Sequence, residues 1–129
     1  MNKPELEFHL PDGPWHTPAG AGPGVEERVL AQDPGRGRRT VLVRWAPGTD
    51  TSGQGVARHD FWEEVYLLEG ALHDVTLGRT FTAGMYACRP PGMPHGPWTA
   101  RDGVTMLVIT YPDSPPGDDR SREDPNERP

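Results

Sequence analysis

The most informative part of the chain is a pair of segments, residues 57–70 and 84–95, which read ARHDFWEEVYLLEG and GMYACRPPGMPH. The first segment contains His59 and Glu63, and the second ends at His95. Two imidazoles and one carboxylate make the face that binds Fe(II) or a similar divalent ion. The Pro-Pro-Gly-Met-Pro turn before His95 stiffens the backbone, which is the rigid support that a metal ligand needs. These three residues are therefore candidate ligands of one metal ion, provided that the fold brings them together.

The sequence around these segments is typical of short β-strands, which favour β-branched and aromatic residues. Strands are expected at residues 25–30, 40–45, 64–69, 71–77, 85–89 and 104–111. Segments 64–69 and 71–77 are predicted to pair as a hairpin that turns at Glu69-Gly70. Proline or glycine interrupts nearly every gap, and no segment keeps a helical period. The pattern predicts an all-β sandwich or barrel, and a barrel leaves an interior that can hold one ligand.

The two ends of the chain differ from its middle in composition. Residues 1–24 contain five prolines and four glycines and are predicted to be an extended arm. Residues 112–129 carry a charge of −3 and no large apolar side chain. Such a segment cannot bury enough apolar surface to offset its ordering entropy, so we predict a disordered acidic tail. A single β-barrel domain is expected between these ends, at residues 25–111.

Length and charge exclude several classes of protein. A chain of 129 residues is one domain of ordinary size, and its net charge of −6 argues against a nucleic-acid partner. No apolar stretch approaches the roughly 20 residues that cross a membrane. The first residues lack the apolar core of a secretion signal. Cys88 is the only cysteine, which excludes an internal disulfide and a cysteine-rich zinc site. We expect a soluble cytoplasmic protein with no membrane partner.

Both segments resemble the two motifs of the cupin superfamily. The first motif is His-x-His, three or four residues, Glu, six residues and Gly, and residues 59–70 match it. Ala57 stands where this motif has its first histidine. The second motif is Gly, five residues, Pro-x-Gly, two residues and His, and residues 84–95 match it. The sequences of residues 63–70 and 89–92 most resemble those of small single-domain cupins related to the anti-sigma-factor cupin domain and to acetylacetone-cleaving dioxygenases.

The resemblance implies a single-domain cupin, which is a double-stranded β-helix or jelly-roll barrel, and it implies a homodimer. It implies one divalent metal ion held by His59, Glu63 and His95, with Fe(II) favoured and Zn(II), Mn(II) or Ni(II) as alternatives. The expected function is a metal-dependent enzyme acting on a small oxygenated organic substrate. The reaction would be dioxygenation, or enolisation, isomerisation, cyclisation or lyase chemistry without oxygen. The alternatives are a non-catalytic ligand-binding or sensing module, and a barrel that has lost its metal because Ala57 replaces a ligand.

Four further residues are candidates for lining a substrate pocket: Arg44, Trp62, Cys88 and Trp98. The arginine could hold an anionic substrate through its planar fork, or it could point to solvent. The two tryptophans could form the walls around a planar substrate, or they could cover the core. The cysteine could be a pocket thiol or a small buried apolar residue. Glu64 competes with Glu63 as the carboxylate ligand, because adjacent strand residues face opposite sides of a sheet.

Overall fold

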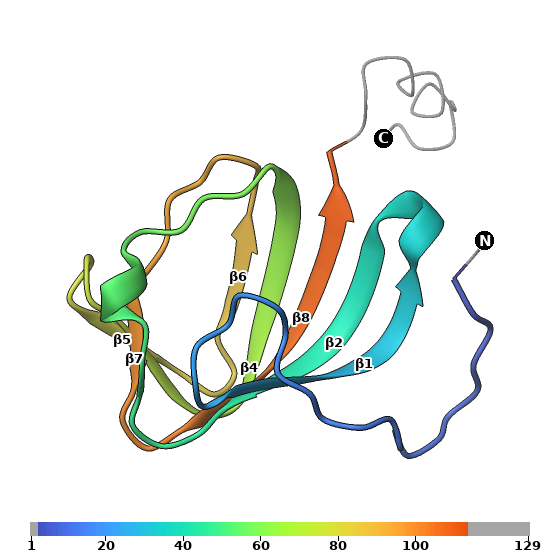
Figure 1. Ribbon diagram of the computed structural model, residues 1–129, viewed down its shortest axis with the longest axis horizontal. Coiled ribbons are helices and arrows are strands. Elements are labelled where there is room, and N and C mark those ends of the chain that lie inside the picture. The colour runs from blue at the N-terminus through green and yellow to red at the C-terminus, as the bar shows by residue number, and fades with distance from the viewer. Residues whose placement is uncertain (1–2, 114–129) are drawn as a thin grey trace.

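The computed structural model describes residues 3–113, which form one curled antiparallel sheet with no α-helix among them (Figure 1). The strands are β1 (Val25–Asp33), β2 (Arg38–Trp45), β3 (Thr49–Asp50), β4 (Phe61–Asp74), β5 (Arg79–Thr82), β6 (Tyr86–Arg89), β7 (Trp98–Ala100) and β8 (Val104–Pro112). Two short 3-10 helices, η1 (Pro34–Arg36) and η2 (Ser52–Gln54), lie in the connections. The all-β prediction is confirmed. The part of the predicted acidic tail that follows Asp113 lies outside the described residues.

The strand order of the sheet is β1-β2-β8-β4-β7-β3, with β5 and β6 also paired to β4. The first half of β4 pairs with β8 and β6, and its second half pairs with β5 and β7. β4 therefore belongs to both halves of the curled sheet and forms the corner between them (Figure 1). This arrangement makes the open barrel that the cupin resemblance implies.

The hairpin predicted at Glu69-Gly70 is wrong, because β4 runs through these residues as one strand. A bulge between Leu67 and Glu69 shifts its register against β8. Gly70 has φ of +81°, and a Cβ atom at this position would overlap the carbonyl oxygen of Gly103. The glycine therefore permits a sharp bend and a close approach of two backbones. A glycine in a turn has the same conformational freedom, so the sequence alone does not distinguish the two cases.

The inner face of the sheet consists of rows of side chains from directly paired residues. One row holds Val41, Val108 and Val65, and the next holds Val43, Met106 and Leu67. Most of these side chains belong to the buried core, and Val43 packs against it. Alternation along each strand places the row Arg39, Thr110, Glu63 and Arg89 on the same face, two residues further along. The inner face thus has an apolar floor and one polar row beside it.

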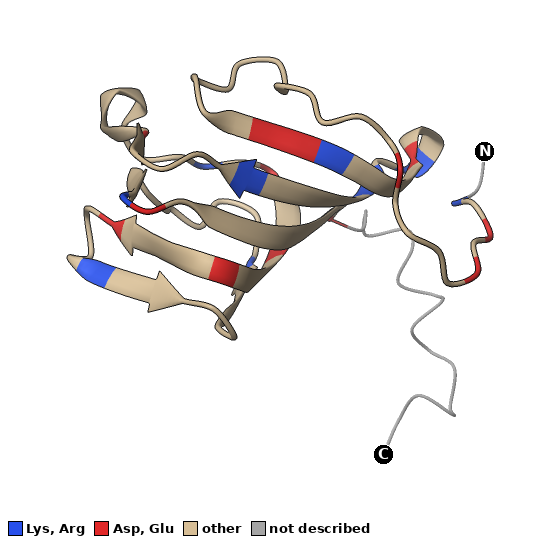
Figure 2. Ribbon diagram, turned by 90° about the horizontal axis from the view of Figure 1, so that it is seen from below, with Lys and Arg blue, Asp and Glu red and all other residues tan. Residues whose placement is uncertain are grey.

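Figure 2 shows the basic and acidic residues distributed over the strands and turns of the described chain. The acidic and basic positions lie near one another on several strands, as at Glu26 and Arg44, which form an ion pair. None of the described helices has the length and apolar character required to cross a membrane.

Candidate metal centre

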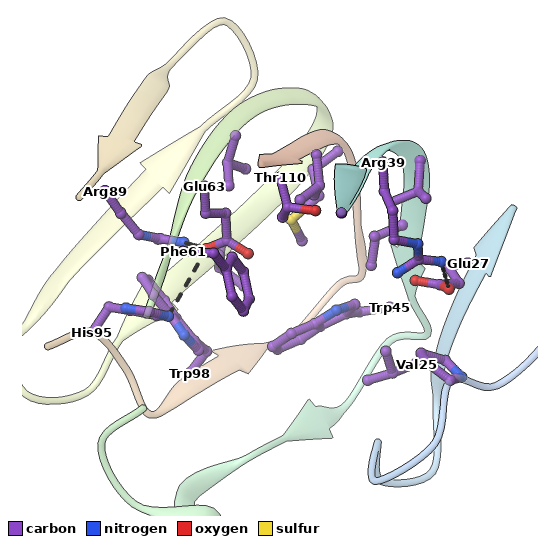
Figure 3. Close-up of a pocket in the computed structure, with 18 of the residues that line it drawn as sticks. Val25, Glu27, Arg39, Trp45, Phe61, Glu63, Arg89, His95, Trp98 and Thr110 are labelled. Carbon is purple, nitrogen blue, oxygen red and sulfur yellow. Dashed lines mark hydrogen bonds and ion pairs between the residues drawn. The ribbon is translucent and has the colours of Figure 1, made fainter. Parts of the chain in front are cut away.

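A cavity of about 870 Å³ opens on the inner face of the curled sheet. Glu63, Arg89 and His95 lie at one end of the group of side chains that line it, and Glu27 and Arg39 lie at the other (Figure 3). The apolar rows of β2, β4 and β8 form its floor. The cavity therefore joins two charged groups across an apolar surface.

The structure brings together the three predicted metal ligands. Glu63 lies on the inner face of β4, His59 lies two residues before that strand, and His95 lies in the loop between β6 and β7. The Glu63 carboxylate oxygen Oε1 is 3.6 Å from His59 Nε2 and 3.9 Å from His95 Nε2. Their ligand atoms all lie within 4.8 Å of one another. The side chains are half-buried to nearly buried, with exposed fractions of 18%, 18% and 9% for His59, Glu63 and His95.

Both imidazole rings are oriented by the backbone of their own loops. His59 Nδ1 lies 3.1 Å from the carbonyl oxygen of Phe61, and His95 Nδ1 lies 3.1 Å from that of Met93. A carbonyl oxygen can only accept, so each Nδ1 donates its proton and each Nε2 of a neutral ring keeps a lone pair. A backbone carbonyl on the distal ring nitrogen is the support usual for a metal-binding histidine. His59 also stacks on the Phe61 ring at 4.0 Å, which limits its rotation.

The residues present fit a divalent ion. The buried His59 Nε2 has no hydrogen-bond partner among the described residues, although buried polar atoms are normally paired. Atoms that bind one ion at about 2.0–2.2 Å lie about 3–3.5 Å apart. Small rotations of Glu63 and the two imidazoles would therefore bring all three ligand atoms onto one ion. Two imidazoles and one carboxylate suit Fe(II), Zn(II), Mn(II) or Ni(II).

Arg89 is a site residue that the sequence analysis did not identify. It lies directly opposite Glu63 in the β4–β6 pairing, and its Nη1 donates to Glu63 Oε1 at 2.8 Å. Its guanidinium also lies 5.0 Å from the Trp98 ring. Burial, and next the positive charge of Arg89, lower the pKa of His95 from its ordinary value. A lowered pKa keeps this imidazole neutral, which is the form that can bind a metal.

Ala57 lies next to the proposed centre, as the cupin motif requires of the residue at this position. Its N–H donates to the carbonyl of His95 at 2.8 Å, and the His95 N–H donates back at 3.0 Å. Residues that exchange both bonds lie opposite one another, with side chains on the same face. The methyl group of Ala57 therefore stands beside the His95 imidazole, where it supplies no ligand atom.

The structure places one of the four other pocket candidates in the cavity. Trp98 lines it, next to His95. Arg44 forms an ion pair with Glu26 and lies 3.9 Å above the Trp15 ring, away from this cavity. Cys88 is exposed.

Trp62 and Glu64 lie on the outer face of β4 because they alternate with the inward Glu63. Trp62 stacks with Tyr111 and donates its indole N–H to Asp113. Glu64 accepts hydrogen bonds from the hydroxyls of Tyr86 and Tyr111. The strand register thus separates the two adjacent glutamates, and it directs Glu63 to the cavity.

The sequence matches a family model described as the ChrR cupin-like domain over residues 5–112. No curated protein sequence matches the chain significantly.

Several solved structures are similar to this one. An acetylacetone dioxygenase from Acinetobacter johnsonii superposes with a TM-score of 0.67 at 17% identity, over 83% of this chain and 74% of that one. The polyketide cyclase RemF from Streptomyces resistomycificus superposes with a TM-score of 0.66 at 23% identity, over 87% of this chain and 82% of that one. A chain in the complex of Rhodobacter sphaeroides SigE with the anti-sigma ChrR superposes with a TM-score of 0.59 at 25% identity, over 79% of this chain and 51% of that one. These likenesses show the cupin fold, and they extend from enzymes to a regulatory complex.

Proposed function

Because the chain belongs to the ChrR cupin-like domain family, we propose that it is a small metal-dependent cupin enzyme acting on a small oxygenated organic substrate. One observation carries this proposal. The buried Nε2 of His59, which has no hydrogen-bond partner within residues 3–113, faces Glu63 Oε1. His95 Nε2 faces the same oxygen, at one end of a cavity of about 870 Å³. The proposed metal is Fe(II), and Zn(II), Mn(II) and Ni(II) suit the same ligands.

A bound divalent ion would supply Lewis-acid chemistry, which polarises a carbonyl oxygen, and Fe(II) would add chemistry with dioxygen. The protein's own residues supply the rest. His59, Glu63 and His95 would hold the ion as three ligands, and Ala57 would add no fourth. Arg89 holds the Glu63 carboxylate and lines the same cavity. A β-dicarbonyl compound, which offers two oxygens to a metal, suits this arrangement.

Comparison of His95→Ala with His73→Ala tests the proposal. His73 contacts Thr80 and is not among the residues that line the cavity, so it is a matched imidazole control. We expect His95→Ala to lose stoichiometric metal, and to lose activity in an oxygen-consumption assay with acetylacetone. His73→Ala should keep both. Equal metal content in wild type and His95→Ala would refute the site, and full metal loss with activity retained would separate the metal from the chemistry.

A non-catalytic sensing module is the second candidate function. It is favoured by the family description and by the likeness to a chain of the SigE–ChrR complex. In this case the purified protein would bind metal stoichiometrically and bind acetylacetone, but it would consume neither oxygen nor the dicarbonyl. Isotope-labelled acetylacetone followed by NMR distinguishes the two functions, since any turnover changes its carbon spectrum.

A further inference from the structure

The cavity contains a second charged group, Glu27 and Arg39, away from the proposed metal centre (Figure 3). Arg39 Nη2 donates to Glu27 Oε1, and His16 Nε2 lies 3.2 Å from the same oxygen. The Glu27 side chain is 8% exposed and the Arg39 side chain is 40% exposed. A nearly buried carboxylate therefore holds one side of a guanidinium that remains open to the cavity.

Arg39 retains hydrogen-bonding capacity after this ion pair. A guanidinium has five N–H donors in a planar fork, and Glu27 is the side-chain partner of Arg39 within residues 3–113. The geometry of such a fork matches a carboxylate. Since Glu27 fixes the position of the guanidinium, an incoming carboxylate would meet a donor that is already oriented.

The polar row of the inner face sets the spacing between Arg39 and the metal centre. Arg39 is paired with Thr110, and Thr110 is paired with Glu63. Neighbouring strands lie about 4.7–4.9 Å apart, so the backbones at Arg39 and Glu63 are separated by about 10 Å. Thr110 lies directly between the two ends, and the valines of the next row form the apolar surface beside it. This geometry suits a short molecule with a polar group at each end and an apolar body.

The cavity is lined by four carboxylates and two guanidiniums: Glu27, Asp60, Glu63, Asp113, Arg39 and Arg89. Glu27 is paired with Arg39, and Glu63 is paired with Arg89. A divalent ion at the metal centre would bring the sum of these charges to zero. The carboxylate of a substrate would therefore be held by the local hydrogen-bond donors of Arg39 and not by an overall positive charge of the cavity.

We propose that Arg39 is the carboxylate-binding residue of a substrate subsite. The substrate class is an oxo acid with two metal-binding oxygens at one end, a short apolar body, and a carboxylate at the other end. The metal end of this inference rests on the proposed function, whereas the carboxylate end rests on the geometry of Arg39 alone.

Binding of hexanoate and hexan-1-ol to the metal-free protein tests the carboxylate end by itself. We expect hexanoate to shift the Arg39 Nε resonance in NMR and hexan-1-ol not to shift it. Arg39→Gln keeps a donor toward Glu27 but loses the positive fork, and it should weaken hexanoate binding about tenfold or more. Arg38→Gln is the control, because Arg38 is exposed and is not among the residues that line the cavity. Equal binding of both probes, or an unchanged hexanoate affinity in Arg39→Gln, overturns the inference.

The zinc-loaded protein tests the two ends together, with succinylacetone and butyrylacetone as probes. These diketones differ only in a terminal carboxylate or methyl group. We expect succinylacetone to bind more tightly to wild type and Arg38→Gln, and both probes to bind equally to Arg39→Gln with metal content unchanged. Equal binding of both probes to the wild type contradicts the subsite and leaves the metal proposal standing. If zinc does not bind stoichiometrically, the proposed function fails, and the hexanoate result still decides the role of Arg39.

Discussion

Single residues at the proposed metal centre are oriented by their neighbours in sequence. His59 and His95 each direct Nδ1 to a carbonyl oxygen two residues away, at Phe61 and Met93. The ring orientation of each histidine is therefore determined within its own loop. β4 then needs to supply only the carboxylate of Glu63 at the correct distance.

Ala57→His should tighten metal binding. The Ala57 side chain lies on the same face as that of His95, so an imidazole there would add a fourth ligand. We expect the dissociation constant for Zn(II) to fall at least about tenfold, which corresponds to about 1.4 kcal/mol. Competition against a chromogenic chelator measures it. Arg58→His is the control, since adjacent residues of an extended chain face opposite ways; equal tightening in both variants would contradict the placement of position 57.

Glu64 should contribute to stability only while it is ionised. Hydrogen bonds from Tyr111, and next from Tyr86, lower the pKa of Glu64 from its ordinary value of 4.5. Its folded pKa is below its unfolded pKa, so its contribution is present above pH 4.5 and is lost as the pH falls through the folded pKa. The urea midpoints of wild type and Glu64→Gln should differ most near neutral pH and converge in acid. A difference that stays constant down to pH 3 would contradict this account.

Tyr111, one of the two tyrosines that donate to Glu64, has a matching pKa shift. The Glu64 carboxylate raises the pKa of Tyr111 to about 12. The sign is opposite to that of the carboxylate, because the protonated phenol is the hydrogen-bond donor. This contribution is present below the ordinary phenol pKa of 10 and is lost as the pH rises toward 12.

The sequence predicted the candidate ligands of the proposed centre, but it did not predict the neighbouring residues that position them. Motif spacing indicated His59, Glu63 and His95 without any knowledge of register. The choice of Glu63 over Glu64, and the presence of Arg89, depend on which residues of β6 and β8 lie opposite β4. No local pattern specifies these long-range pairings, so the arginine could not be found by spacing alone.

At the scale of elements, the bend of β4 depends on Gly70. Gly70→Ala should destabilise the fold, because the residue has φ of +81° and a Cβ atom would overlap the Gly103 carbonyl. The left-handed conformation alone costs about 1–2 kcal/mol for a residue with a side chain, and displacement of Gly103 adds to it. The free energy of unfolding in urea should therefore fall by more than about 2 kcal/mol.

Gly78→Ala is the matched control for this prediction. Gly78 has φ of +64° and nothing within 4 Å of its would-be Cβ atom. It should lose only the conformational part, about 1–2 kcal/mol. If both variants lowered the free energy of unfolding equally, the close approach of the two backbones at Gly70 would make no contribution to the destabilisation.

The wrong hairpin at Glu69-Gly70 shows where sequence patterns fail at this scale. A glycine between two apolar runs predicts a turn, and the same residue also permits a bend inside one strand. Only the partners distinguish the two cases. Here the two halves of the strand pair with different neighbours, β8 and β6 on one side and β5 and β7 on the other. The composition of this segment predicted that it forms β-strand, but it did not predict that one strand runs from Phe61 to Asp74.

At the scale of the whole molecule, we predict a homodimer, as the cupin resemblance implies. The outer face of β4 and β6 exposes Tyr66, Leu68 and Tyr86, and Tyr66 lies directly opposite Tyr86. Sedimentation at micromolar concentration should give twice the mass of 14.2 kDa. Leu68→Lys should weaken the dimer if this face forms the interface. A wild-type monomer at micromolar concentration would refute the dimer.

The position of β8 in the sheet has a consequence for the order in which the protein folds. β8 is the last strand of residues 3–113, and it lies between β2 and β4. During synthesis the β1–β2 hairpin and the pairings of β4 with β5, β6 and β7 need only residues up to 100. The cavity joins the two groups, so it first exists when residues 104–112 dock between them. A ribosome-bound chain that stops before β8 would therefore carry all three candidate metal ligands without the cavity in which they are proposed to act.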